Sequence, residues 1–90
     1  VALTANSARR YGLRTSEGLL ITEVRQGSEA ARQSLGRGMI IIEANRKRMT
    51  SVRDFEDILK KTASGDEVIL LVRQETDGSS SDFIATVKVR

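Results

Sequence analysis

The sequence contains no histidine, cysteine, proline or tryptophan, and aromatic residues make up only 3% of it. Without cysteine there is neither a disulfide framework nor a thiolate metal site. Without histidine, the commonest general base and the commonest metal ligand are both absent. An enzyme built on this sequence would have to rely on carboxylates, lysine, serine or Tyr11. The composition therefore disfavours catalysis, and we expect neither a cofactor nor a metal.

Length and charge narrow the class of protein further. The 90 residues favour a single domain, spanning 1–90, with a modest core. The net charge of +3 is too weak an excess to require an anionic partner. No apolar run approaches the roughly 20 residues of a membrane span, and no signal peptide is recognisable. The sequence begins at Val1 without a methionine, so we expect it to be a fragment of a longer protein.

Three segments carry the signals of helix starts, each preceded by a serine or threonine that suits the N-cap position. The third segment also places apolar residues at spacings of 3, 3 and 1, which predicts an amphipathic helix. These apolar residues are Val52, Phe55, Ile58 and Leu59. The predicted helices span Ala5–Tyr11, Glu29–Ser34 and Val52–Lys61.

Runs of strand-forming residues separate these helices and are bounded by glycines or polar turns. A short extended piece is expected around Arg48 and Met49, and the polar segment ETDGSSSD predicts a hairpin loop around Asp77-Gly78. The predicted strands are Val1–Leu3, Leu19–Val24, Met39–Ala44, Val68–Arg73 and Phe83–Val89. The element order predicts an α+β fold: a small, partly open antiparallel barrel or sandwich with the long helix plugging one side.

The stretch from Gly27 to Asn45 resembles the central signature of bacterial PDZ domains in HtrA (Do-like, DegP-type) serine proteases. The residues that carry the resemblance are Gly27-Ser28, Ala30-Ala31, Leu35, Gly38 and the run IIIEAN. The segment MTSVRDFEDIL is similar to the groove helix of that family, and LTANSARRYGL to its helical insertion. The resemblance covers nearly the whole sequence. It implies a PDZ-like fold of five to six strands and two to three helices, in the circularly permuted bacterial strand order.

The sequence departs from the family pattern at several positions. Glu29 stands where the family usually has proline, Ser34 where it has glycine, and Met39 where it has aspartate. Arg46 replaces a glycine, so we expect Arg46 to lie in a turn that needs a positive φ. The family's carboxylate-binding loop would precede the first strand, so either the sequence starts just after that loop or the domain lacks it. We expect the first strand to be truncated.

The resemblance implies a non-catalytic peptide-binding module in which an extended peptide or a protein C-terminus adds as a β-strand beside the groove helix. We expect Val52 and Leu59 to line an apolar pocket, with Glu56 between them, and Phe55 and Ile58 to turn toward the core. The complete set of residues expected to bind peptide is Val1, Ala2, Leu3, Thr4, Val52, Glu56, Leu59 and Lys60.

The resemblance also implies the setting of the domain. The parent would be a homo-oligomeric serine endopeptidase in the bacterial periplasm or cell envelope. Its PDZ domain would bind peptides, protein C-termini and unfolded substrates, and would regulate the protease domain. Two alternatives remain open. The domain belongs to a site-2 protease, a C-terminal processing protease or a secretion scaffold, or it only packs against neighbouring domains.

Other clusters in the sequence suggest more specialised sites but lack the accompanying features. The basic residues Arg46–Arg48 fall in a turn and have no aromatic partners, so we expect no nucleic-acid binding. Arg9 and Arg10 are expected on the exposed side of the first helix. The carboxylates in 54–57 spread around their helix, and Gly36–Gly38 lacks the Lys-Ser/Thr pair of a phosphate-binding loop.

Overall fold

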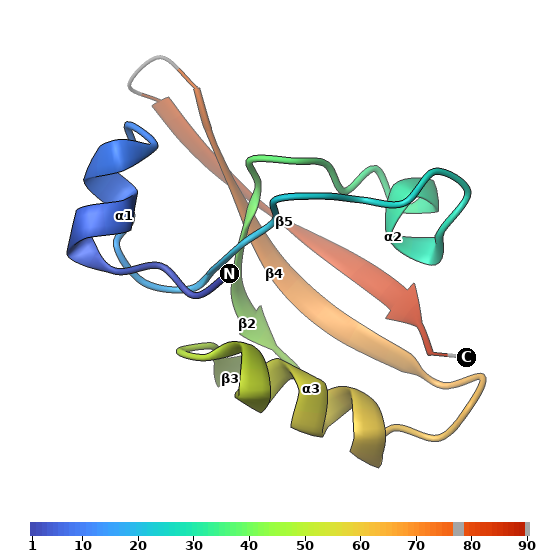
Figure 1. Ribbon diagram of the computed structural model, residues 1–90. Helices are drawn as coiled ribbons and strands as arrows, with labels where there is room; N and C mark the ends of the chain where they lie inside the picture. The colour runs from blue at the N-terminus through green and yellow to red at the C-terminus, as the bar shows by residue number, and fades with distance from the viewer. Residues whose placement is uncertain (77–78, 90) are drawn as a thin grey trace.

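The computed structural model describes residues 1–76 and 79–89, which form an antiparallel sheet with three helices around it (Figure 1). The helices are α1 (Ala5–Arg10), α2 (Glu29–Arg32) and α3 (Val52–Lys61). The strands are β1 (Leu19–Leu20), β2 (Ile40–Ala44), β3 (Lys47–Arg48), β4 (Glu67–Thr76) and β5 (Ser79–Lys88). The strand order is β1-β2-β4-β5, and β3 pairs with β2. These residues thus confirm the α+β fold, with five strands in an open sheet.

Helix α3 has the bounds that the sequence predicts, because both of its ends carry strong local signals. The Ser51 side chain accepts a hydrogen bond from the Asp54 N–H, which satisfies one of the free donors of the first turn. Lys60 and Lys61 lie in the last turn, where positive charge suits the helix dipole. Helix α1 similarly begins after Thr4, which forms a capping box with Ser7.

The hairpin of β4 and β5 is longer than predicted and runs most of the length of the molecule in Figure 1. The two strands pair in register from Glu67↔Lys88 to Thr76↔Ser79. The prediction of a loop over 75–82 was therefore wrong for residues 75, 76 and 79–82, which belong to the ladder; Asp77 and Gly78 lie outside the described residues. Polar side chains did not end the strands, because ladder hydrogen bonds join backbone groups.

Strand β1 is shorter than predicted. Leu19 and Leu20 pair with Ile41 and Ile40, but the residues from Ile21 to Val24 lie outside the assigned strand. Ile21 still exchanges backbone hydrogen bonds with its neighbours, donating to the Met39 carbonyl at 2.8 Å and accepting from the Gly38 N–H at 2.8 Å. Beyond Ile21 the backbone stays beside the sheet without a ladder partner. This unpaired stretch becomes important at the candidate site.

The sheet has apolar residues on both faces near β1 and β2. The larger cluster includes Leu19 and Ile41, and residues of α3 pack against it. The smaller cluster consists of Leu3, Leu20 and Ile40. Because neighbouring residues of a strand point to opposite faces, the two clusters lie on opposite sides of the sheet. Gly18 lies close against β2, where an added Cβ atom would come within 2.8 Å of the Ile41 carbonyl oxygen.

Among residues 1–76 and 79–89, three non-glycine residues have positive φ angles: Ser34 at 65°, Asn45 at 50° and Arg46 at 67°. Asn45 and Arg46 form the two-residue turn between β2 and β3, a hairpin type that requires left-handed backbone at both positions. The expectation for Arg46 is therefore confirmed. Asn45 also steadies the turn, because its N–H donates to the Ile69 carbonyl at 2.7 Å and its side-chain oxygen accepts from the Ile69 N–H at 2.9 Å.

Candidate functional site

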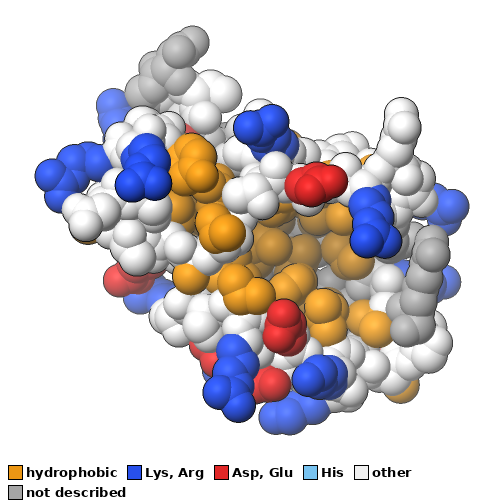
Figure 2. All heavy atoms as spheres, viewed as in Figure 1, with side chains coloured by type: hydrophobic (Ala, Val, Ile, Leu, Met, Phe, Trp, Pro, Cys, Tyr) orange, Lys and Arg blue, Asp and Glu red, His pale blue; other side chains and the backbone are white. Residues whose placement is uncertain are grey.

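An apolar groove runs between helix α3 and the segment from Leu20 to Arg25. It consists of two hollows, one of about 390 Å³ and one of about 220 Å³, which share Ile21, Glu23, Ile41 and Phe55. We call these two hollows together the α3 groove. Figure 2 shows hydrophobic side chains gathered in a depression at the centre of this face, with charged side chains around its rim. The floor is supplied by the sheet and one wall by the helix.

The backbone beside the α3 groove has unsatisfied hydrogen-bonding groups. Val1 and Leu20 exchange two hydrogen bonds, of 2.7 and 2.9 Å, and the Leu3 N–H donates to Gly18 at 2.9 Å. This pattern directs the N–H and C=O of Ala2 away from β1. Among the described residues, neither Ala2 nor Thr22 has a backbone hydrogen bond. A strand edge with free donors and acceptors is a template for another strand.

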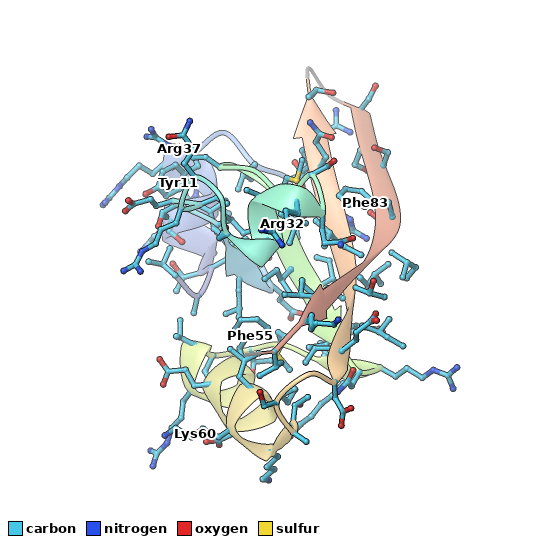
Figure 3. The ribbon with its side chains drawn as sticks, turned by 90° about the vertical axis from the view of Figure 1, so that its right-hand side faces the viewer. Tyr11, Arg32, Arg37, Phe55, Lys60 and Phe83 are labelled. Carbon is cyan, nitrogen blue, oxygen red and sulfur yellow. The ribbon has the colours of Figure 1, made fainter. Side chains whose placement is uncertain are left out.

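The structure brings together some of the residues predicted to bind peptide. Val1 and Val52 line the same end of the α3 groove, where their side chains are 55% and 41% exposed. Leu59 lines the other end. Glu56 and Lys60 are exposed and do not line the groove, and Lys60 points away from the molecule in Figure 3.

The predicted edge strand divides into residues with different environments. The Leu3 side chain is buried in the smaller cluster, on the opposite face from α3. The backbone of Thr4 serves α1, since its N–H donates to the Ser7 hydroxyl and its carbonyl accepts from the Ala8 N–H. Ala2 is therefore the residue of this segment whose backbone remains open to a partner.

The sequence prediction included none of the four residues that line both hollows, and Phe55 and Glu23 show why. Phe55 was expected to turn into the core, and it does pack against the larger cluster, but it also forms a wall of the α3 groove. Figure 3 shows Phe55 pointing from α3 toward the centre of the molecule. Glu23 was not considered, because its position within a predicted strand did not reveal which side it faces. The available signal was its spacing of four residues from the buried Leu19, which places both side chains on the same face of a strand.

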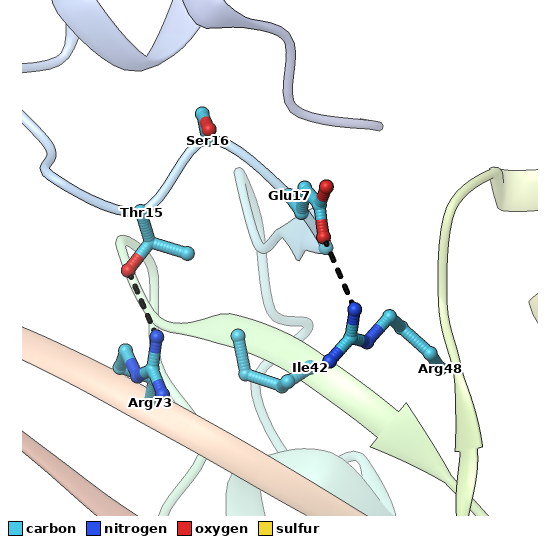
Figure 4. A pocket seen from close by; sticks show the side chains of 7 residues that line it. Thr15, Ser16, Glu17, Ile42, Arg48 and Arg73 are labelled. Carbon is cyan, nitrogen blue, oxygen red and sulfur yellow. Dashed lines mark hydrogen bonds and ion pairs between the residues drawn. The ribbon is translucent and has the colours of Figure 1, made fainter.

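Apart from the α3 groove, a polar hollow of about 270 Å³ lies on the sheet near the loop before β1 (Figure 4). Its charged groups already have partners. Arg73 pairs with Asp82 and also donates to the Thr15 hydroxyl at 3.2 Å, and Arg48 lies 3.7 Å from Glu17. The hollow is therefore a set of ion pairs and hydrogen bonds that joins the loop to the hairpin, rather than an open site for a charged ligand.

The charged groups of this network shift the pKa values of one another. A hydrogen bond from Arg73 lowers the pKa of Asp82, and the same bond raises the pKa of Arg73. Burial alone would raise the pKa of Glu75. Hydrogen bonds from the Thr15 hydroxyl and from the N–H groups of Arg14 and Thr15 outweigh burial, so the pKa of Glu75 is lowered. The Glu75 carboxylate thus binds the loop more strongly in its ionised form.

Two further kinds of site are absent from the described part of the molecule. Residues 1–76 and 79–89 contain no group of three or more His, Cys, Asp or Glu side chains placed to hold a metal. None of the helices within these ranges combines the length and the apolar character needed to cross a bilayer.

The chain is similar to known proteases. It is 34% identical over 73 residues to a probable periplasmic serine endoprotease, DegP-like, of Chlamydia muridarum, a match that extends over 80% of its length. It is 32% identical over 84 residues, or 92% of its length, to the corresponding protein of Chlamydia pneumoniae. The chain spans only 14% and 16% of the length of these two relatives. No family model matches it.

Solved structures show the same fold. All of the chain superimposes on a structure of the HtrA-type protease AlgW with a decapeptide, with a TM-score of 0.77 and 24% identity. A variant of the same protease with a tripeptide gives a TM-score of 0.66. These matches cover 27% and 29% of the AlgW chains.

The fold and the groove define the class of this protein as a small α+β domain of PDZ type, with a helix beside an open strand edge. The particular family follows from the relatives: the chain is related to the DegP-like, HtrA-type serine endoproteases. The resemblance noted in the sequence is thereby confirmed. The names of the relatives also agree with the expected periplasmic localisation.

Proposed function

We propose that the chain is a non-catalytic peptide-binding domain of a periplasmic HtrA-type serine protease. An extended peptide adds as a strand to the sheet margin of the predicted edge Val1–Thr4, through the open backbone of Ala2, and inserts an apolar side chain into the α3 groove. In this way the domain recruits unfolded substrates to the protease, or regulates it. The observation that carries the proposal is the α3 groove itself, an apolar hollow bordered by backbone groups that lack partners among the described residues. The AlgW structures with peptides support it by analogy.

The energetics favour a weak, sampling interaction. Backbone hydrogen bonds along the edge would accept many sequences, and the groove would select for apolar side chains. Burial of one such side chain against Val52, Phe55 or Leu59 contributes roughly 1.5–3 kcal/mol. Association costs at least several kcal/mol in lost freedom. We therefore expect micromolar or weaker affinity.

The charged residues of the predicted site act from the rim. Glu56 and Lys60 are exposed on the outer surface of α3 and do not line the α3 groove. They would influence the charge of the residues that flank the inserted side chain, with Glu56 favouring a basic or hydroxyl-bearing ligand residue. Because exposed charges interact weakly, replacing either one should change affinity by less than about fivefold.

The test is a titration with a decapeptide that ends in apolar residues and with a copy that ends in aspartate, followed through backbone amide shifts. We expect only the apolar peptide to bind, with shifts at Ala2, Thr22 and along α3. Val52→Asp should weaken binding by about tenfold or more, which corresponds to about 1.4 kcal/mol. Aspartate suits the first turn of a helix, so the fold should survive this change.

Arg53→Asp is the matched control. Arg53 is exposed in the same helical turn and does not line the α3 groove, so its replacement should leave affinity almost unchanged. Equal losses in the two variants would point to a general charge effect and contradict the assignment of the groove. Failure of every peptide to bind a folded domain would favour the alternative in which this surface packs against a neighbouring domain.

A further inference from the structure

Outside the α3 groove, another apolar hollow of about 190 Å³ lies between the end of α1 and the loop at Gly36–Gly38. Tyr11, which caps α1 and is 54% exposed, and Arg37 both line it. Figure 3 shows Tyr11 and Arg37 close together at one side of the molecule, far from Phe55. The aliphatic residues Leu13 and Leu20 form part of the lining. We call this hollow and the surrounding surface of α1 the α1 corner.

The α1 corner is distinct from the α3 groove. Leu20 belongs to the smaller apolar cluster, on the face of the sheet opposite to the cluster against which Phe55 packs. The two hollows meet only at the segment from Leu20 to Thr22, which contributes to both. A ligand in the α1 corner and a ligand in the α3 groove therefore approach the sheet from opposite sides.

Most charges around the α1 corner are positive, and the Glu75 carboxylate, which accepts from the Arg14 N–H at 2.8 Å, is a nearby negative charge. Residues 1–16 and 30–42 contain no aspartate or glutamate, and they carry the exposed arginines Arg9, Arg10, Arg14 and Arg37. Figure 2 shows Lys and Arg side chains gathered at the corner where Figure 1 places α1. Within the described ranges, the side chains of Arg10, Arg14 and Arg37 have neither an ion pair nor a hydrogen bond. These charges are available to an anionic partner.

The lining of the hollow decides what kind of polyanion fits. Aliphatic side chains and a tyrosine would accept an apolar side chain, whereas they offer few polar groups to read a base edge. The Thr22 backbone at the margin of the hollow has no partner among the described residues, and only a polypeptide would pair with it as a strand. The surface thus combines positive charge, an apolar hollow and an open backbone edge.

We propose that the α1 corner binds an acidic polypeptide segment that inserts one apolar side chain between Tyr11 and Arg37. This site acts in addition to the α3 groove and does not depend on peptide binding there. Acidic residues on either side of the inserted residue pair with Arg37 and with the arginines of α1. Such contacts between exposed charges weaken as salt screens them, so binding is strongest at low ionic strength.

The probe is a synthetic twelve-residue peptide with one central leucine flanked by aspartate and glutamate. Two control peptides replace the acidic residues with lysine or the leucine with serine. Titrations at low salt, followed through amide shifts, should show binding of the acidic leucine peptide alone, with shifts at Leu13, Arg37 and Gly38, which line only this hollow. Raising the salt to about 0.3 M, where the screening length falls below about 10 Å, should weaken binding severalfold.

Arg37→Glu should weaken binding by about fivefold or more, because it replaces an attraction with a repulsion. Tyr11→Ser tests the apolar part of the site and should also reduce affinity. Arg53→Glu on α3 makes the same charge change outside the α1 corner and should change affinity by less than about twofold once the net charge effect is screened. The amide spectrum of each variant establishes that it is folded.

Several results would overturn the proposal. These are equal binding of the serine or lysine peptide, shifts confined to the α3 groove, or no binding at millimolar peptide. Tighter binding of phosphatidylglycerol vesicles or a single-stranded oligonucleotide, lost in Arg37→Glu, would assign the α1 corner to a lipid surface or nucleic acid instead. If the acidic peptide binds at the α1 corner but no peptide binds at the α3 groove, the result contradicts the proposed function and leaves this proposal standing.

Discussion

Arg73 and Asp82 face each other across the β4–β5 pair and are joined by two hydrogen bonds, from Nε to Oδ1 at 2.8 Å and from Nη2 to Oδ2 at 3.0 Å. A planar guanidinium matches a carboxylate in this two-point geometry. Arg73 also contacts Thr15, whose hydroxyl donates to Glu75. Two carboxylates with lowered pKa values are therefore linked through one arginine and one threonine.

Stability should depend on pH through this network. A carboxyl group with a lowered pKa in the folded state stabilises the fold above its unfolded pKa, and this contribution is lost as the pH falls through the folded pKa. For Glu75 and Asp82 the loss should begin below about pH 4–5, near the ordinary values of these groups. Urea unfolding between about pH 2 and 7 should show this decline.

The variant Glu75→Gln isolates part of the effect. Glutamine cannot replace both carboxylate oxygens, which accept from Arg14 and Thr15, so the variant should be less stable at neutral pH and lose less on acidification. Glu67→Gln, on the same strand and exposed, is the control and should follow the parent curve. Parallel curves for Glu75→Gln and the parent would contradict the prediction.

Gly18→Ala should destabilise the domain by at least about 2 kcal/mol. Gly18 has a φ of 111°, and an added Cβ would come within 2.8 Å of the Ile41 carbonyl and 2.9 Å of the Ile40 side chain. Both contacts are to buried parts of β2 that have little room to move. Urea unfolding measures the change directly.

Gly12→Ala is the matched control, because Gly12 also has a positive φ, of 70°, but an added Cβ would meet nothing within 4 Å. It should show the backbone strain alone, about 1–2 kcal/mol. The excess loss in Gly18→Ala is then the cost of the clash. Similar losses in the two variants would mean that β2 relaxes freely around residue 18.

Arg46→Gly should stabilise the domain by about 0.5–1 kcal/mol. The left-handed backbone at Arg46 costs roughly 1–2 kcal/mol for a residue with a Cβ, and the greater unfolded-state freedom of glycine offsets part of the gain. The substitution would leave Asn45 followed by a glycine, and an Asn-Gly pair strongly favours this hairpin turn. Thermal and urea unfolding would detect the change.

Lys47→Gly, one residue later, should lower the stability of the domain instead of raising it. Lys47 lies in β3, where its backbone is paired with Ala44 and glycine should cost about 0.5–1 kcal/mol. A loss of stability in both variants would show that the Arg46 side chain supports the turn in a way that outweighs its backbone strain.

The sequence predicted best those parts of the fold that depend on local signals. Helix α3 has its predicted bounds because Ser51 caps it and its apolar spacing is regular. The positive φ at Arg46 was predicted from a missing glycine in a recognisable turn. The length of the β4–β5 hairpin was underestimated, because the pairing of Glu75 with Ser80 depends on backbone hydrogen bonds that no side-chain pattern reveals.

The candidate site was less predictable for the same reason. Val52 and Leu59 line the α3 groove, and their role in peptide binding stays a prediction. The wall formed by Phe55 was not anticipated, since a helical spacing defines a stripe without saying how much of it a sheet covers. The open edge at Thr22 was hidden within a predicted strand. Whether a strand has a neighbour is a property of the whole sheet rather than of its own residues.

The strand order has a consequence for biosynthesis. β2 and β4 form the middle of the sheet, and β4 is joined to β5 over ten paired residues, so the most extensive pairing lies after β1 and β2 along the chain. Leu19 and Leu20 pair with β2, and Ala2 in turn bridges to Leu19. During synthesis β1 and β2 precede β4, so the side chains of Leu19 and Ile41 stay partly uncovered until β4 supplies the rest of the larger cluster. A chaperone that binds nascent chains would be needed longest at the part of the domain around β1.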